Sequence, residues 1–446
     1  MRTSSWVIGV LVGTLGMAAA GCTVARTDIR PTVSVEASSP STAVPTPPRA
    51  EASRLARHVE ILTDPQLAGR HPLEPGGLRA GGYVAERFAE YGLKPWAGEA
   101  GYAQHFGAGV NIIAVLPGGD PALADEFVVL SAHYDHLGVR NGVVFPGAAD
   151  NAAGVAVLLE TARVLAGSPQ RPARSVVFAA FDAEEQGLYG SYMFSAREDF
   201  DEPRFAGLVN LDMLGRATFD AHPNTLLAVG TRRFPQLRAA LRASADDAGL
   251  GLHPVGRELV GPRSDHVAFE PMDRPWVFLT CGPFADYHTP RDTPDKLDLS
   301  ALERSARVVL DAVTWLADVP LIEPPTEPET GDRAEFESIL ILLDGIEQTL
   351  PNELKPSFSG LRRQIQSIGR APDYSIQDHR QTHQLLIMAL APIQYGRELS
   401  FAEIFAVTTA RWSYVDQTGQ YVEERRLKIV EALSSQSPEI PLHSHD

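Results

Sequence analysis

Apolar runs alternate with helical patterns through the middle of the chain, and this alternation restricts the possible fold most strongly. The runs cover residues 111–116, 127–132, 175–181, 208–211, 226–229 and 276–280, and helical patterns lie between several of them, at 152–165, 235–248 and 300–316. Strands that alternate with helices are typical of an α/β fold. Nearly continuous apolar strands indicate a sheet covered on both faces. We therefore predict an α/β sandwich with a mixed, largely parallel sheet.

The N-terminus has the pattern of a secretory signal. Arg2 precedes a short apolar run over residues 6–20, which ends in small residues before Cys22. The run is shorter than the ~20 residues that span a bilayer. Ala-Ala-Gly-Cys at 19–22 is similar to a bacterial lipoprotein processing site, and a plain secretory signal is the alternative. We expect a signal peptide over 1–21 and an exported protein, anchored in the membrane of the cell envelope by a lipid on Cys22.

Changes in composition predict the domain boundaries. After the lipidated cysteine, residues 22–49 are rich in Pro, Ser and Thr, and such a tether cannot bury enough apolar surface to fold. The α/β domain follows over 50–317, and a Pro- and Glu-rich linker covers 318–332. Apolar residues at helical spacing then predict an all-α domain over 333–435. The chain ends in a tail at 436–446.

Net charge and cysteine content restrict the possible binding partners and the possible disulfides. The formal net charge of -17 repels phosphate backbones, so we expect no nucleic-acid binding. The chain has two cysteines, and a lipid on Cys22 would leave Cys281 without a partner. The folded protein would then depend on its apolar core and on bound metal.

Ionisable side chains gather where the apolar runs end. They occur in five segments, which contain His133–Asp135–His136, Asp150, Asp182–Glu184–Glu185, Asp212 and Tyr287–His288. Sites in open α/β sheets form beyond the carboxyl ends of the strands, so these segments should converge. Crowded carboxylates repel one another unless a divalent cation compensates them. A set of His and carboxylate ligands suits zinc, and two ions could share one carboxylate and one water.

The same segments resemble the M28 family of zinc aminopeptidases. The motifs are HYDHLG at 133–138, GAADNAAG at 147–154, DAEEQGLYGS at 182–191, NLDM at 210–213 and DYHTPRDTPDKL at 286–297. Their order and spacing match the family over roughly residues 50–317. The resemblance implies a three-layer α/β/α zinc-peptidase sandwich with two Zn²⁺ ions. It also implies hydrolysis of N-terminal residues, chiefly apolar ones, from peptides by a metal-bridging water.

The resemblance assigns the metal ligands residue by residue, as His133, Asp150, Glu185, Asp212 and His288. In the family pattern, His133 and Asp212 hold one zinc, Glu185 and His288 hold the other, and Asp150 bridges the two. The family also has a cis peptide bond after the bridging aspartate. We therefore expect one between Asp150 and Asn151.

Three further residues receive catalytic roles from the resemblance. Glu184 corresponds to the general base, which takes a proton from water and delivers it to the leaving amine. Asp135 corresponds to the residue that orients His133 through its second ring nitrogen. Tyr287 corresponds to a hydroxyl that donates to the tetrahedral oxyanion.

Other functions on the same fold remain possible at this point. Glutaminyl cyclases use one zinc and do not hydrolyse, and the complete set of five ligands argues against them. Carboxypeptidases and dipeptidases need a cation for the substrate carboxylate, for which Arg216, Arg263 and Arg291 are candidates. A non-catalytic binding protein would lack ligands or the base, and none is missing here. The helical domain could dimerise, cover the cleft or bind an unknown partner.

The remaining candidate residues are better explained without catalysis. We expect His136 to be structural and Cys281 to be a small buried residue. Ser264-Asp265-His266 could imitate part of a serine triad, but this would leave the other five segments unexplained. His379 and His383 lie four apart on a predicted helix, a spacing that can bind metal. Since no third ligand is obvious, we expect them on a solvated helix face.

Overall fold

The computed structural model describes residues 49–96, 101–322, 331–350, 352, 355–371, 373–395 and 418–434. The described residues form one compact unit. The predicted signal peptide, Cys22 and the predicted tail lie outside the described residues. Within the described part of the chain, no helix is long and apolar enough to cross a membrane.

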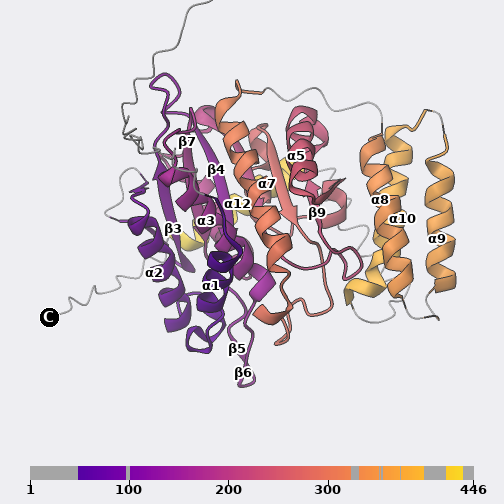
Figure 1. The fold of residues 1–446 in the computed structure, drawn as a ribbon, viewed down its shortest axis with the longest axis horizontal. Helices are drawn as coiled ribbons and strands as arrows, with labels where there is room; N and C mark the ends of the chain where they lie inside the picture. The colour runs from indigo at the N-terminus through magenta and orange to yellow at the C-terminus, as the bar shows by residue number, and fades with distance from the viewer. Residues whose placement is uncertain are drawn as a thin grey trace, which may run out of the picture. The chain divides into compact units, whose positions relative to one another are not determined.

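A mixed sheet forms the centre of the fold (Figure 1). Its strands are β1 (Lys94–Pro95), β2 (Ala103–Phe106), β3 (Gly109–Leu116), β4 (Phe127–His133), β7 (Ser175–Phe181), β8 (Phe205–Leu211), β9 (Thr225–Val229), β10 (Gly251–Val255) and β11 (Trp276–Thr280). They lie in the order β1-β3-β7-β4-β8-β11-β9-β10, and β2 pairs with β3. The central strands β7, β4, β8 and β11 are parallel to one another. The strands β3 and β9 pair antiparallel with β7 and β11, so the prediction of a mixed, largely parallel sheet is confirmed.

Helices cover both faces of this sheet. The helices of the α/β part are α1 (Ala52–Leu62), α2 (Pro75–Glu90), α3 (Ala153–Gly167), α4 (Tyr189–Ser195), α5 (Pro235–Ala248), α6 (Arg257–Val260) and α7 (Leu299–Asp318). In Figure 1, α3 and α7 lie in front of the strands, and α1 packs against both. Behind the sheet, α12 (Thr418–Ser434) packs on α4. Every residue of β4, β7 and β8 is buried, as the continuous apolar runs predict.

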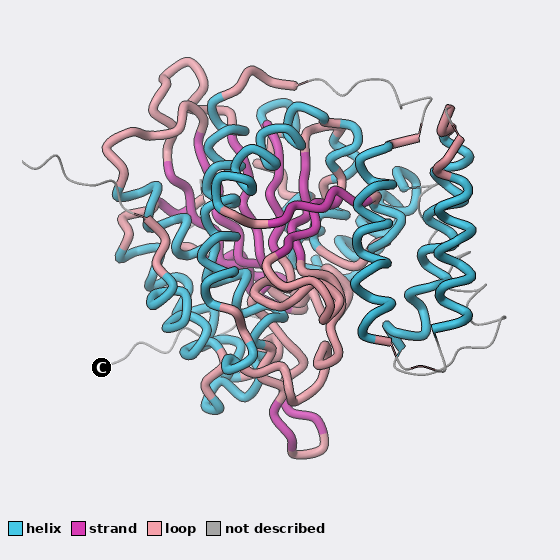
Figure 2. The backbone as a smooth tube through the Cα atoms, turned by 45° about the vertical axis from the view of Figure 1, so that its right-hand side comes forward, coloured by secondary structure: helices cyan, strands magenta, loops and turns pink. Residues whose placement is uncertain are grey.

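Shorter elements connect these layers. Helical turns lie at η1 (Pro65–Arg70), η2 (Ala148–Ala152), η3 (Glu202–Arg204), η4 (Thr231–Arg233), η5 (Asp265–Ala268), η6 (Glu270–Met272) and η7 (Pro294–Lys296). The strands β5 (Val139–Arg140) and β6 (Val143–Val144) form a small hairpin after β4. Figure 2 shows loops gathered at the end of the sheet from which this hairpin extends. These loops carry the predicted site residues.

The C-terminal part of the described chain is helical, as predicted. It contains α8 (Arg333–Thr349), α9 (Lys355–Ile368) and α10 (Ile376–Tyr395), besides α12. The side chain of Asp332 caps α8 by accepting the N–H groups of Ala334 and Glu335. The buried side of α8 includes Ile339 and Leu343, and α8 packs on β10, at the edge of the sheet. The next helix, α9, packs on α8, and α10 contacts both α9 and α6.

Candidate metal centre

The five predicted metal ligands meet at the carboxyl end of the sheet. His133 ends β4, Asp150 lies in the turn before α3, Glu185 follows β7, Asp212 follows β8, and His288 lies in the loop after β11. Their positions follow from the parallel strands, which bring their carboxyl ends to one edge. Four of these side chains are almost fully buried, and His288 is 34% exposed.

Asp150 lies between two groups of these ligands. Its Oδ1 is 3.4 Å from His133 Nε2, which in turn is 3.3 Å from Asp212 Oδ1. Its Oδ2 is 3.2 Å from His288 Nε2, which is 3.0 Å from Glu185 Oε2. The ligand atoms of His133, Asp150 and Asp212 all lie within 4.8 Å of one another, close enough to hold one ion. The two oxygens of Asp150 therefore face two different histidine–carboxylate pairs.

His136, for which we expect a structural role, lies beside this centre. Its Nδ1 is 2.8 Å from Glu185 Oε1 and 3.8 Å from Asp150 Oδ2. The ring is fully buried, and it is not oriented for a hydrogen bond to either carboxylate. His136, Asp150 and Glu185 form a second set of atoms close enough to hold an ion. His136 thus lies against Glu185 and is a further candidate ligand.

Asp135 connects the loop after β4 with the loop after β7. Its carboxylate accepts the backbone N–H groups of Glu184, at 3.1 Å, and Glu185, at 3.3 Å. The distance from Asp135 Oδ1 to His133 Nδ1 is 3.6 Å, which is beyond a hydrogen bond. The carbonyl oxygen of Asp135 is closer to that nitrogen, at 3.2 Å. The Asp135 carboxylate therefore holds the backbone of the two glutamates in place, and it lies beside His133 without a hydrogen bond to that ring.

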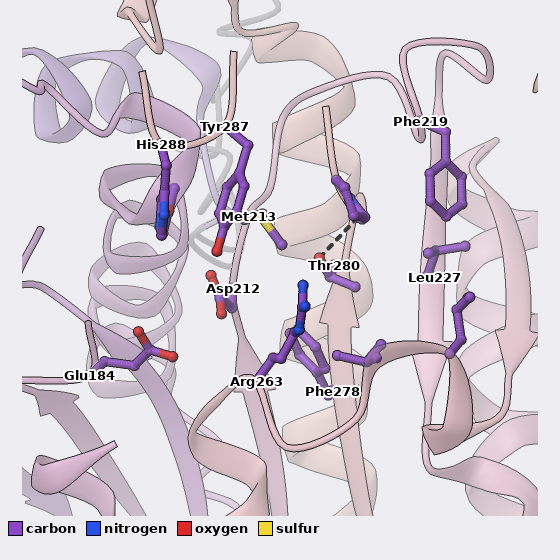
Figure 3. A pocket seen from close by; sticks show the side chains of 15 residues that line it. Glu184, Asp212, Met213, Phe219, Leu227, Arg263, Phe278, Thr280, Tyr287 and His288 are labelled. Atoms are coloured by element: carbon purple, nitrogen blue, oxygen red, sulfur yellow. Dashed lines mark hydrogen bonds and ion pairs between the residues drawn. The ribbon is translucent and has the colours of Figure 1, made fainter. Parts of the chain in front are cut away.

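A pocket opens beside the ligand cluster (Figure 3). Glu184, Tyr287 and Asp212 all line it. The ring of Tyr287 stacks on His288, with 3.9 Å between centroids. Burial raises the pKa of Glu184 well above its usual range; nearby His133 opposes this rise, and Asp212 and Glu185 add to it. The adjacent residues Glu184 and Glu185 therefore lie in different surroundings.

Apolar side chains form much of the pocket wall. They are Met213, Phe219, Leu227, Leu259, Val260 and Phe278. Of the three arginines considered from the sequence, Arg263 lines this pocket. Arg216 lies over the ring of Phe284 and pairs with Asp286, and Arg291 pairs with the same carboxylate.

Arg70 is a supporting residue that sequence reasoning missed. It is fully buried, and its guanidinium donates to the carbonyl oxygens of Leu62, Tyr134, Pro146 and Gly147, at 2.6 to 2.9 Å. Burial lowers the pKa of Arg70 to about 10, while the nearby carboxylates, first Asp150, oppose this change. Arg70 therefore joins the loop that follows His133 to the loop that precedes Asp150.

Asp292 supports the same loop from the other side. Its carboxylate accepts the backbone N–H groups of Ala149, at 3.1 Å, and Asp150, at 3.0 Å. Asp292 lies in the same motif as His288, which was the available sequence signal. The peptide bond between Asp150 and Asn151 is cis, as the family resemblance predicted. The Asn151 side chain donates to the carbonyl oxygen of Leu211, at 2.8 Å.

The structure also locates the alternative candidates. The Ser264 hydroxyl accepts a hydrogen bond from Asn210, and His266 stacks against Trp276 and Phe278. Cys281 is buried, as predicted. The expectation of a solvated face for His379 and His383 is wrong, because both are fully buried. The polar sequence around them did not show that α10 packs against α6 and α9.

Comparisons with known proteins identify similar peptidases. Residues 111–313 match peptidase family M28. A probable zinc metalloprotease of Pyrenophora tritici-repentis is 36% identical over 130 residues, which cover 27% of this chain and 29% of that protein. Leupeptin-inactivating enzyme 1 of Streptomyces exfoliatus is 26% identical over 306 residues, which cover 64% of this chain and 66% of that protein.

A solved structure shows a similar fold. The aminopeptidase from Aneurinibacillus sp. strain AM-1 superposes with a TM-score of 0.50 at 19% identity, over 63% of this chain and 97% of that one. This chain spans less than a third of the length of the zinc metalloprotease relative named above. The family match includes all five predicted metal ligands. Residues 111–313 of this chain are therefore similar, in sequence and in the order of these ligands, to peptidase family M28.

Proposed function

We propose that this chain is a zinc aminopeptidase that holds two ions, one on each side of Asp150. The observation that carries the proposal is the position of the Asp150 carboxylate, whose two oxygens face separate histidine–carboxylate pairs. One pair is His133 with Asp212, and the other is His288 with Glu185. A shared carboxylate between two such pairs is the geometry that a two-metal site requires.

The donor atoms fit a metal. Asp150 Oδ2 and Glu185 Oε1 are buried and accept no hydrogen bond among the described residues. Buried carboxylate oxygens that accept no hydrogen bond are unfavourable, and a divalent cation would satisfy them. Imidazole together with carboxylate ligands suits zinc. Bound zinc would lower the pKa of water and polarise the substrate carbonyl.

Glu184 is proposed as the general base. It borders the same pocket as Asp212 but belongs to neither histidine–carboxylate pair. From this position it would take a proton from the attacking water and return it to the leaving amine. The Tyr287 hydroxyl is proposed to donate a hydrogen bond to the oxyanion that forms on the substrate carbonyl. Asp135 would hold the loop of Glu184 and Glu185 in place through their backbone N–H groups.

The pocket supports a peptide substrate with an apolar first residue. Its apolar wall would bury an apolar side chain, which is favourable by roughly 1.5–3 kcal/mol for a Leu or Phe. The carboxylates of Glu184 and Asp212 in the same pocket would attract the free ammonium group. We propose that these two features together select an unblocked, apolar N-terminal residue.

A substrate panel tests the proposal. Leucine and phenylalanine p-nitroanilides should be hydrolysed, and their N-acetylated forms should not. A chelator should abolish the activity, and zinc should restore it. Activity confined to blocked substrates, or activity that survives removal of all metal, would contradict the proposal. A glutaminyl-cyclase-like enzyme would instead cyclise N-terminal glutamine and leave the leucine substrate intact.

A carboxypeptidase or dipeptidase is the second candidate, because Arg263 lines the pocket. A guanidinium there could bind the carboxylate of a short substrate. The dipeptide Leu-Gly and its C-terminal amide separate the two functions. An aminopeptidase cleaves both, whereas an enzyme that needs the carboxylate cleaves only the free acid. Replacement Arg263→Met should then remove the preference for the free acid.

We also propose that the protein is exported and held at the membrane by a lipid on Cys22. Support comes from the charged start, the short apolar run and the Ala-Ala-Gly-Cys sequence at 19–22. The Pro- and Ser-rich segment that follows would keep the catalytic domain at a distance from the lipid surface.

A further inference from the structure

A second cluster of metal-ligating side chains lies where α6, α8 and α10 meet. It consists of Glu258 on α6, Glu335 on α8, and His379 and His383 on α10. Glu258 is 2% exposed, and the other three are fully buried. None of the four belongs to the centre around Asp150. We call them the histidine–glutamate cluster.

The donor atoms of the cluster converge on one small space beside the backbone of Gly256. A Cβ atom at Gly256 would clash with Glu258 Oε2 and would lie 2.7 Å from His383 Nε2 and 3.1 Å from Glu335 Oε2. Ligand atoms of Glu258, His379 and His383 all lie within 4.8 Å of one another. Because glycine has no side chain, an opening remains at this position, and three donor atoms face it.

His383 presents a lone pair to this space. His383 Nδ1 is 3.0 Å from the carbonyl oxygen of His379, so it must carry the proton and donate. This hydrogen bond leaves His383 Nε2 as an acceptor, the state in which imidazole binds a metal. His379 Nε2 is 3.3 Å from Glu335 Oε2, and His383 Nε2 is 4.0 Å from the same oxygen.

Several of these atoms have no hydrogen bond among the described residues. They are Glu258 Oε2, both carboxylate oxygens of Glu335, and His383 Nε2. All of them are acceptors, so they cannot satisfy one another without an added proton or cation. Burial of two carboxylates in this state is strongly unfavourable.

Arg232 accounts for only part of the cluster. Its guanidinium is 3.2 Å from Glu258 Oε1 and 2.5 Å from His379 Nε2, but 3.9 Å from Glu335 Oε2. One guanidinium charge cannot balance two carboxylates. Its contacts also leave Glu258 Oε2 and His383 Nε2 without partners. The cluster therefore retains a set of inward-facing acceptors after Arg232 is counted.

We propose that Glu258, Glu335, His379 and His383 bind a zinc ion, separate from the centre around Asp150. Two imidazoles and two carboxylates make a four-ligand set that suits zinc. The two histidines lie four residues apart on α10, which places them on one face of the helix. Four protein ligands leave no open position for water or substrate, so the ion has a structural role.

This ion would join the C-terminal helices to the wall of the pocket. Glu258 lies in α6, whose next two residues, Leu259 and Val260, line the pocket beside Asp150 and Glu184. A zinc held by α8 and α10 would therefore fix the position of α6. If the proposed function is correct, loss of the ion should weaken substrate binding more than it slows the chemical step.

Anomalous diffraction tests the site directly. Crystals of the full chain grown with zinc should show an anomalous peak between Glu258 and His383. Absence of that peak from zinc-containing crystals overturns the proposal, whether or not zinc is found around Asp150. A peak in the histidine–glutamate cluster with none around Asp150 would support this site and contradict the proposed function, so the two failures are distinguishable.

Metal analysis of variants gives an independent measurement. The double variant His379→Gln/His383→Gln should contain one zinc per chain less than the wild type, and its KM for leucine p-nitroanilide should rise while kcat is retained. Two matched controls are Glu337→Gln, an exposed glutamate on α8, and His253→Gln, a half-buried histidine on β10. Both controls should keep the wild-type zinc content.

Equal zinc in the double variant and the wild type would overturn the proposal. If the double variant does not fold, the single variant Glu335→Gln repeats the comparison.

Discussion

Glu184 and Glu185 are neighbours in the chain, but their carboxylates have different surroundings. Glu185 Oε2 lies 3.0 Å from His288 Nε2, whereas Glu184 lines the pocket. We expect Glu184→Gln to keep its zinc and to lose about 10²–10⁴-fold in kcat, because the amide cannot take up a proton. Glu185→Gln should instead lose zinc. Metal analysis and kcat of both variants check this, and full turnover by Glu184→Gln would remove the assignment of the base.

His266 gives a prediction about pH. It is fully buried against Trp276 and Phe278, and burial lowers its pKa to about 3, with a further contribution from Arg257. The folded protein keeps His266 neutral, whereas the unfolded chain takes up a proton below pH ~6.5. His266 therefore costs stability as the pH falls, by about 2 kcal/mol between pH 7 and pH 5.

The variant His266→Phe removes this titration and keeps an aromatic ring between the same neighbours. Its Tm should fall less than that of the wild type when the pH is lowered from 7 to 5. Comparison of the two Tm differences cancels the other groups that titrate in this range. Identical falls in both proteins would show that His266 takes up a proton in the folded state.

The sequence predicted the residues that approach the metal centre better than those that support it. The five ligand positions follow from strand ends and from the motifs, and the structure brings them together. Arg70 could not be found in this way, because its partners Pro146 and Gly147 lie 76 and 77 residues away. Nothing near Arg70 in the sequence indicates that it will be buried.

The same reason explains the error at His379. Its partner Arg232 is 147 residues distant along the chain, and α10 is too polar for its burial to be predicted from spacing alone.

At the scale of elements, the helix α3 begins directly at the centre. Gly154 lies in its first turn, and a Cβ atom at this position would clash with Asn151 Oδ1. We expect Gly154→Ala to lower both Tm and zinc affinity, because the Asn151 side chain must move and lose its bond to Leu211.

Gly82 provides the matched control for this substitution. It is an exposed glycine within α2, and a Cβ atom there would have no neighbour within 4 Å. Gly82→Ala should stabilise the protein by roughly 0.5–1 kcal/mol through helix propensity. Thermal unfolding and zinc titration of both variants separate the two effects. A stable, zinc-binding Gly154→Ala variant would show that Asn151 is not held in place by this contact.

The buried strands were predicted closely, and three strands at the sheet edges were missed. The run at 175–181 became β7 with the same bounds, and 127–132 became β4 with one more residue, His133. By contrast, β1, β2 and β10 have two to five residues each and are only partly buried. Their pairing at the sheet edges depends on neighbours that local patterns do not contain.

At the scale of the whole molecule, the proposed lipid anchor makes a prediction about location. Replacement Cys22→Ser removes the acceptor for the lipid. The variant should move from the membrane fraction to the soluble exported fraction and should keep its specific activity. Fractionation and mass analysis of the mature N-terminus check both points. Membrane association that survives the replacement would contradict lipidation at this residue.

The C-terminal helices make a second prediction at this scale. The buried side of α8 covers the edge strand β10, and Arg425 on α12 donates to the carbonyl oxygen of Gly187, two residues after Glu185. A chain that ends at residue 330 should therefore aggregate and lose turnover, because β10 and the glutamate loop are uncovered. A chain that ends at residue 434 is the control. Size-exclusion chromatography and kcat measure the outcome, and a monomeric, fully active truncation would contradict this role.

The support that Asp292 gives to the Asp150 loop also bears on when the centre can form during synthesis. Asp292 and Ala149 are 143 residues apart along the chain. At about 5–20 residues per second, a ribosome needs roughly 7–30 s to add that length. Throughout this interval the loop that carries Asp150 exists without the carboxylate that accepts its N–H groups. If the proposed function is correct, a nascent chain cannot assemble the centre step by step, and the ions would be taken up only after Asp292, residue 292 of 446, has been added.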